Sequence, residues 1–209
     1  RNRARLEYRH DFVTVWEHFK YGGIVATANF TVPGMEKSTA NEVIGILDNR
    51  MVALVDLALT LKHVHWNVVG PNFIAVHEML DPQVDSVRAM VDATAERIAT
   101  LGGEPVGTPA AVSERRGWTD YSLGRALATE HLAALDVVYD GVNEDHRKAI
   151  ARLGDIDPVS EDLLLGQSAD LELFQWFVRA HLESSTGTLA SADATSEKGA
   201  AKAARAANG

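Results

Sequence analysis

The feature that most constrains the fold is a series of four long segments in which apolar residues recur at three- and four-residue steps. In the first segment this spacing places the apolar residues on one face of a helix, at Val43, Leu47, Met51, Leu54, Ala58 and Leu61. Glycine and proline clusters separate the segments, and both residue types end helices. We therefore predict an all-α protein. The predicted helices span residues 38–68, 73–101, 122–153 and 158–183.

The lengths of the connections predict how these helices are arranged. Short links join the first helix to the second and the third to the fourth, whereas residues 102–121 form one long connection. Helices of roughly 26–32 residues are about 40–48 Å long, and a link of this size can span that length. The pattern is typical of a ferritin-like four-helix bundle with one long crossover. We expect the crossover to carry a short extra helix at residues 109–115.

Both ends of the chain differ from this pattern. Residues 1–37 combine an arginine-rich start with aromatic residues that follow no clean period, and residues 184–209 are rich in Ala, Ser and Gly. Two interpretations of residues 1–24 stand: a native basic arm, or a translated leader before a start at Val25. We expect residues 38–183 to form the bundle domain and residues 184–209 to form a flexible tail.

Composition narrows the class of protein. The formal net charge is −9, and such an acidic body disfavours general binding to nucleic acid. The chain has no cysteine, which excludes disulfides and thiolate metal sites and fits a reducing cytosol. We find no run of 18 apolar residues and no signal-peptide pattern. We therefore expect a cytoplasmic protein without membrane contact.

Five side chains carry the functional signal, and they are spaced 12, 4, 11 and 4 residues apart. Imidazoles and carboxylates together are the ligands of redox-active or hydrolytic transition metals. At 100° per residue, the last four project within about a 100° arc of one helix. The first and last of these four are about 28 Å apart along the helix axis, so no single metal site spans them. The five residues are His65, His77, Asp81, Asp92 and Glu96.

A contact between two chains resolves this separation. A two-fold axis near residue 87 would run two copies of the helix antiparallel, with His77 and Asp81 of one copy against Asp92 and Glu96 of the other. His65, near the end of the first helix, joins the histidine half from its own chain. Each pair alone is more typical of a solvated helix face, but two pairs in phase behind a further His favour a metal site. We predict two identical sites per dimer and no tight metal binding by a monomer.

Four sequence motifs stand out: HWNVVGPNFIAVHEMLD at 65–81, DATAER at 92–97, LGG at 101–103 and FQWF at 174–177. With these motifs the chain resembles the Dps family of DNA-protecting, starvation-induced ferritins. The resemblance covers about residues 30–183, and residues 61–66 and 177–183 give it an actinobacterial character. It implies a hollow homododecamer of tetrahedral symmetry with intersubunit ferroxidase centres at the five residues above. Fe(II) would be oxidised there to Fe(III) by hydrogen peroxide or dioxygen and stored as a ferric mineral, without an organic cofactor.

Further positions receive roles by this resemblance or by their place. Trp66 and Trp176 are either electron donors that quench radicals or ordinary core aromatics. Asp162, with Asp157 nearby, is expected to line an acidic iron-entry pore, although Asp157 is also suited to cap the fourth helix. Near the metal ligands, Lys62 is a candidate salt-bridge partner.

Two local features qualify these roles. His63 points away from His65 on the helix and is expected to be a structural or a surface histidine. Pro82 should kink the second helix, or restart it with Asp81 as the cap, and a cap role would compete with metal ligation.

DNA binding and two rival functions stay open. Lys198, Lys202 and Arg205 oppose two acidic residues in the C-terminal tail, and twelve copies acting together would strengthen weak contacts with DNA. The same tail also fits a merely solubilising role. One alternative function is a metal-dependent hydrolase, for example of amides, because His/carboxylate sites activate water. The other is a structural DNA-compacting protein with a vestigial metal site.

Overall fold

The computed structural model describes residue 28 and residues 30–207. Both interpretations of residues 1–24 lie outside the described residues and stay predictions. Within the described part, no helix combines the length and the apolar character needed to cross a bilayer.

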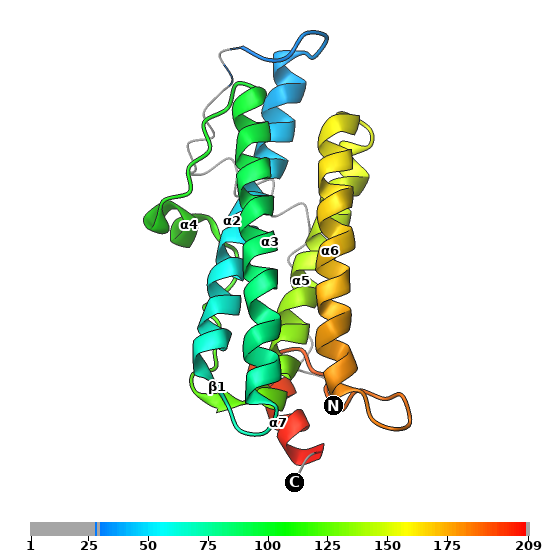
Figure 1. Cartoon of the computed structure of the whole chain (residues 1–209). Helices are drawn as coiled ribbons and strands as arrows, with labels where there is room; N and C mark the ends of the chain where they lie inside the picture. The colour runs from blue at the N-terminus through cyan, green and yellow to red at the C-terminus, as the bar shows by residue number, and fades with distance from the viewer. Residues whose placement is uncertain (1–27, 29, 208–209) are drawn as a thin grey trace, which may run out of the picture.

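Four long helices form the body of the molecule (Figure 1). Helix α2 packs along α3, and α5 packs along α6, so that two helical hairpins make up the bundle. The short α4 lies outside the bundle, in the crossover, and contacts α2. This arrangement confirms the predicted all-α ferritin-like fold with a long crossover and an extra helix. The bounds are α2 Lys37–Asn67, α3 Phe73–Thr100, α4 Pro109–Arg115, α5 Ala128–Leu153 and α6 Pro158–Leu182.

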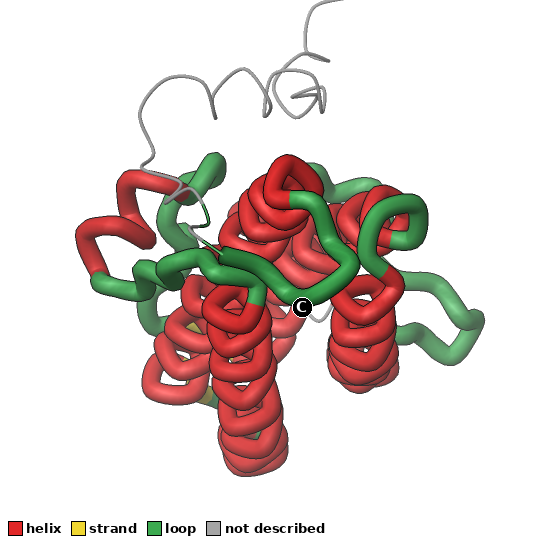
Figure 2. The backbone as a smooth tube through the Cα atoms, turned by 90° about the horizontal axis from the view of Figure 1, so that it is seen from above, coloured by secondary structure: helices red, strands yellow, loops and turns green. Residues whose placement is uncertain are grey.

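Two large apolar clusters fill the bundle, with a polar layer between them, and a third, small cluster joins α7 to α5. One cluster surrounds Leu54, Leu80 and Tyr139, and the other surrounds Leu47 and Ile98. Figure 2 shows from above how the helices run side by side around this interior.

Each long helix contributes to the polar layer. Gln167 donates to Thr94 Oγ1 at 2.9 Å, and His146 Nε2 lies 3.3 Å from Gln167 Oε1. Burial and the nearby Arg50 charge lower the pKa of His146 to about 4, so this ring is neutral at pH 7. Arg50 is itself buried and lies 3.6 Å from Asp145.

The third long helix begins at Ala128 instead of residue 122 as predicted. Strand β1 (Val68–Val69) pairs in parallel with β2 (Ala126–Leu127), so the chain is extended just before α5. Glu130 Oε2 then accepts a hydrogen bond from the Leu127 N–H at 3.0 Å and satisfies a free donor at the helix start. The two-residue strands are too short to leave a periodic pattern.

The C-terminal segment differs from the flexible tail expected over residues 184–209. Helix α7 (Glu197–Ala207) packs on α5 and buries Ala200, Ala201 and Ala204 against it. Alanine has the highest helix propensity, and residues four apart share a face, so this sequence presents a flat apolar stripe. Arg205 Nε lies 2.7 Å from Glu130 Oε1 and ties the helix down.

Candidate metal centre

Two histidines meet where the end of α2 lies beside the start of α3. The buried His65 places Nδ1 2.8 Å from the His77 carbonyl oxygen, and His77 Nδ1 lies 2.9 Å from the His65 carbonyl oxygen. The rings stack with centroids 3.6 Å apart and 21° between their planes. A carbonyl oxygen only accepts, so each Nδ1 carries the proton and donates. Both Nε2 atoms therefore keep a lone pair for a metal ion.

The tight turn between α2 and α3 sets this reciprocal contact. Gly70 and Asn72 both adopt positive φ, at 87° and 64°. A side chain at Gly70 would also meet Leu127 Cδ2 at 2.7 Å, because β2 passes beside the turn. The turn and the β1–β2 pairing together fix the register in which His65 faces His77.

Asp81 lies beside His65, and its side chain is an ionised carboxylate. Lys62 donates to Asp81 Oδ1 at 2.5 Å, as expected of a salt-bridge partner, and His65 Nδ1 is 3.3 Å from the same oxygen. The hydrogen bond from Lys62, with its positive charge, holds the pKa of Asp81 below its usual value. Helix α3 runs through Pro82 without a break, so the predicted restart at Asp81 does not occur.

The two remaining candidates lie farther along α3. Asp92 and Glu96 are exposed, and within the described structure neither carboxylate has a hydrogen bond or an ion pair. The separation along α3 is about 16 Å from Asp81 to Asp92 and about 28 Å from His77 to Glu96. Nowhere in residues 30–207 do three or more His, Asp or Glu side chains gather closely enough to hold a metal ion. One chain thus carries an imidazole half and a carboxylate half apart from each other.

The two tryptophans lie on the surface. Trp66 is 70% exposed beside His65, and Trp176 is 59% exposed on α6. The interpretation of both as ordinary core aromatics is therefore wrong for the single chain. The described ring contacts join Trp176 to Phe177, at 5.3 Å between centroids, and do not join the two tryptophans.

The predicted pore residues have opposite environments. Asp162 is exposed on α6. Asp157 is 3% exposed, and its Oδ2 accepts hydrogen bonds from Ser160 and, at 2.8 Å, from Arg97. Burial would raise the pKa of Asp157, but these hydrogen bonds outweigh it and hold the pKa below the usual range. This contradicts a pore role for Asp157, because its carboxylate is enclosed and committed to Arg97.

His63 has the structural place that was expected for it. Its Nε2 lies 2.8 Å from the Leu123 carbonyl oxygen, and its ring meets the edge of Tyr121 at 5.8 Å. It therefore ties the end of α2 to the crossover.

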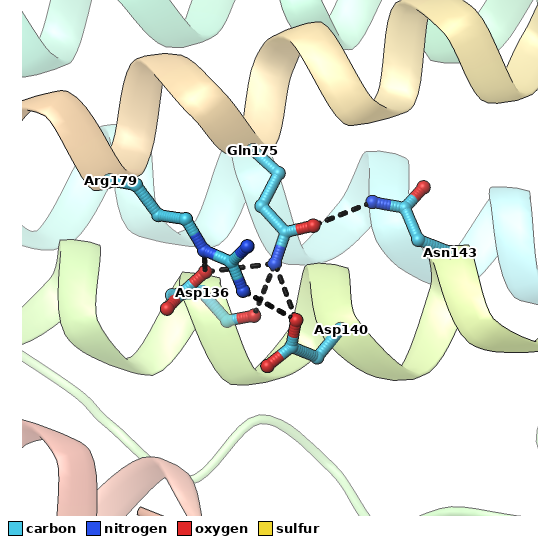
Figure 3. Close-up of polar contacts among 5 residues, drawn as sticks. All are labelled: Asp136, Asp140, Asn143, Gln175 and Arg179. Carbon is cyan, nitrogen blue, oxygen red and sulfur yellow. Dashed lines mark hydrogen bonds and ion pairs between the residues drawn. The ribbon is translucent and has the colours of Figure 1, made fainter. Parts of the chain in front are cut away.

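Sequence reasoning missed a polar clamp between α5 and α6 (Figure 3). Gln175 donates to Asp136 Oδ1 at 2.8 Å and to Asp140 Oδ1 at 2.7 Å, and accepts from Asn143 at 2.8 Å. Arg179 donates to the same two carboxylates at 2.6 and 2.7 Å. With Gln175 turned toward α5, the next residue, Trp176, is turned outward. The only signal in the sequence was the FQWF motif, whose Gln sits among aromatic residues.

Comparisons with known proteins identify the family. Residues 44–186 match the ferritin-like domain family. The chain is 56% identical to the DNA protection during starvation protein of Mycolicibacterium smegmatis over 177 residues, or 85% of this chain and 97% of that protein. Among solved structures, DpsA14 from Streptomyces coelicolor is 63% identical with a TM-score of 0.78, covering 79% of this chain and 99% of that one.

A second solved structure agrees. The tetragonal form of Mycobacterium smegmatis Dps is 57% identical with a TM-score of 0.77, and the match covers 78% of this chain and 98% of that chain. The family match includes most of the bundle, and the matches cover nearly the full length of these relatives. The chain therefore belongs to the Dps family of ferritin-like proteins.

Proposed function

We propose that this chain assembles into a dodecameric cage that oxidises Fe(II) at sites shared by two subunits and stores the ferric product, thereby protecting DNA. The observation that carries the proposal is the division of the ligands along α3. His65 and His77 offer two free Nε2 atoms at one end, and Asp92 and Glu96 offer two unpaired carboxylates near the other. Only an antiparallel second copy joins the halves into one site.

The charges between the two halves fit the same symmetry. An axis midway between residues 86 and 87 relates His77 to Glu96 and Asp81 to Asp92, and it also relates position 85 to position 88. Asp85 and Arg88 occupy those positions, and both are exposed. Each would face the opposite charge across the contact, which favours this register over neighbouring ones.

Exposed apolar side chains further support assembly. Leu59 is 62% exposed and Trp66 is 70% exposed, and these residues are two turns apart on one face of α2. On α6, Leu165, Leu173 and Trp176 are also exposed, beside Asp162. A monomeric protein rarely presents so many large apolar side chains to water. A cage in which both faces are covered by neighbouring subunits accounts for them.

The proposed chemistry follows from the ligands. Two Fe(II) ions and one hydrogen peroxide give two Fe(III) ions and two hydroxide ions, so the O–O bond breaks without releasing a radical. Carboxylate oxygens favour the harder Fe(III) and so promote the oxidation, while the imidazoles hold Fe(II). Asp81 would supply a third carboxylate if its oxygens were divided between Lys62 and the iron.

The decisive experiment is complementation between two inactive variants. His77→Ala and the double variant Asp92→Ala/Glu96→Ala should each abolish the fast phase of Fe(II) oxidation by peroxide in stopped-flow absorbance. In a mixed dimer one of the two sites combines the intact histidine half of one chain with the intact carboxylate half of the other. Refolding the two variants together should therefore restore part of the rate.

The control for this experiment is Glu104→Ala/Glu114→Ala, which removes two exposed carboxylates away from α3 and should keep the full rate. Fast oxidation by either inactive variant alone would refute the site. Failure of the mixed protein to recover, despite mixed dimers in native mass spectrometry, would refute its position between subunits.

We also propose that DNA contacts the C-terminal helix. Lys198 and Lys202 are exposed on α7, whereas Arg205 is engaged with Glu130. Changing Lys198 and Lys202 to Gln should weaken retardation of DNA in a gel shift, and raising the salt concentration should do the same to the unaltered protein. Retardation that is unchanged by both treatments would assign DNA binding to another part of the chain. In the described structure nothing favours the amide-hydrolase alternative.

A further inference from the structure

A tyrosine–histidine pair lies next to the proposed site and takes no part in the chemistry described so far. Tyr121, in the crossover between α4 and β2, has its phenolic oxygen 3.0 Å from Nδ1 of His131 on α5. The two rings lie nearly parallel, with centroids 6.0 Å apart. His131 is fully buried, and Tyr121 is half-buried.

The protonation states of this pair are defined by its surroundings. Burial, reinforced by the negative charge of Glu197, raises the pKa of the Tyr121 phenol well above its usual value, so the phenol is protonated. Burial also lowers the pKa of His131, so the imidazole is neutral. We assign the lone pair of the neutral imidazole to Nδ1, so that the protonated Tyr121 phenol donates its O–H to that atom.

The pair adjoins the turn of α2 that carries a metal ligand. Tyr121 contacts the His63 ring at 5.8 Å between centroids, and His63 is two residues before His65. Positions two apart project on opposite sides of a helix and are about 3 Å apart along its axis. The phenol therefore lies across one helix, about 10 Å thick, from the proposed iron site.

We propose that Tyr121 is a one-electron donor to the iron site, with His131 as the acceptor of its proton. This inference rests on the proposed function, because the oxidant is peroxide reacting with Fe(II). It meets a specific need: a site that holds one Fe(II) supplies one electron, but peroxide requires two for complete reduction.

The step balances in atoms and electrons. Fe(II), hydrogen peroxide, the Tyr121 phenol and neutral His131 give Fe(III), two hydroxide ions, the Tyr121 phenoxyl radical and protonated His131. The O–O bond breaks, iron and tyrosine each lose one electron, and the phenolic proton moves to Nδ1. A second Fe(II) then reduces the phenoxyl radical, and the proton returns from His131 to the phenolic oxygen. The sum is again two Fe(II) oxidised for each peroxide, without free hydroxyl radical.

The chain contains a matched control. Tyr139 is a buried residue of α5, and its hydroxyl donates at 2.8 Å to the side-chain oxygen of Gln83. An amide oxygen is a poor base and cannot take the proton. Tyr139 is more deeply buried than Tyr121, and its hydroxyl also has a hydrogen-bond acceptor, but that acceptor is not a base.

Electron paramagnetic resonance tests the proposal. The assembled protein is loaded with one Fe(II) per site, mixed with excess peroxide and frozen within milliseconds. We expect a tyrosyl signal that is narrowed when ring-deuterated tyrosine is incorporated, lost in Tyr121→Phe and kept in Tyr139→Phe. Spin-trapped hydroxyl radical should increase in Tyr121→Phe and stay at the level of the unaltered protein in Tyr139→Phe.

The outcomes separate this inference from the proposed function. No Fe(III) formation by the unaltered protein with peroxide would remove the proposed function and this inference with it. Rapid Fe(III) formation with no tyrosyl signal, with a signal that survives Tyr121→Phe, or with a tryptophan signal only would overturn the role of Tyr121 alone. The isotope experiment uses the unaltered fold, so the absence of a narrowed tyrosyl signal overturns the role of Tyr121 even if Tyr121→Phe is poorly assembled.

Discussion

At the residue scale, the hydrogen bonds of the two site histidines matter as much as their identity. Each ring donates Nδ1–H to the backbone carbonyl of the other, so the tautomer is fixed before any metal binds. The sequence predicted which residues would be ligands from their spacing. It did not predict this reciprocal bonding, because that depends on the turn geometry at Gly70 and Asn72.

Asp157 shows the opposite case, in which a residue expected at a functional surface has a stabilising role. Changing Asp157 to Asn leaves the Arg97 guanidinium with a neutral partner and should cost about 1.5–3 kcal/mol of stability at pH 7. The carboxylate has a lowered pKa in the fold, so its stabilising contribution is complete above the unfolded pKa of about 3.9 and is lost as pH falls through the folded value.

Thermal unfolding at several pH values checks this prediction at fixed protein concentration. The unaltered protein should lose stability more steeply than Asp157→Asn below about pH 4. Asp162→Asn, at an exposed position of the same helix, should melt like the unaltered protein. Equal melting temperatures for all three proteins at pH 7 would show that the buried ion pair is neutral for stability.

At the scale of elements, periodicity predicted the four long helices because each has one continuous apolar face. Their ends agree within one residue, except the start of α5, which lies six residues later than predicted. Periodicity missed the segments whose structure depends on contacts with residues far away in the sequence. The β1–β2 pair joins residues on either side of α3 and α4, and α7 owes its place to the α5 surface. An alanine-rich composition is equally typical of a disordered tail, and only the partner face distinguishes the two.

Helix α7 should leave α5 at acidic pH. Burial opposes ionisation of Glu130, but hydrogen bonds from Arg205 and the Leu127 backbone outweigh it and hold its pKa below the usual value. The ion pair therefore holds α7 above the unfolded pKa of about 4.3 and is lost as pH falls through the folded value. Glu130→Gln should release α7 already at pH 7, seen as faster trypsin cleavage at Lys198 and Lys202.

A change remote from α7 provides the comparison. Glu172→Gln affects an ion pair with Arg147 between α5 and α6 and should leave the rate of tail cleavage unchanged. Equal cleavage of the tail in all three proteins would mean that the alanine stripe alone holds α7.

At the scale of the whole molecule, the proposed dimer predicts a charge-reversal rescue. Asp85→Arg should place arginines opposite each other across the two-fold axis and weaken the dimer, and Arg88→Asp should do the same with aspartates. The double variant restores opposite charges and should recover assembly. Native mass spectrometry across a range of salt concentrations measures the dimer and dodecamer fractions.

The reversal of Arg147, exposed on α5 away from this contact, is the control and should not alter dimer formation. A double variant no better assembled than either single variant would place the two-fold axis elsewhere on α3.

Because α3 continues through Pro82 without a break, it fixes the distance between the residues at its two ends. In the proposed dimer, α3 of each subunit sets the spacing between its imidazoles and its carboxylates, and each site takes the histidine end of one α3 and the carboxylate end of the other. Deleting one residue between Asp81 and Asp92 would turn the carboxylates by about 100° relative to the histidines. Under this proposal both sites of the dimer would be lost together, so α3 of each chain must keep this length for two sites at once.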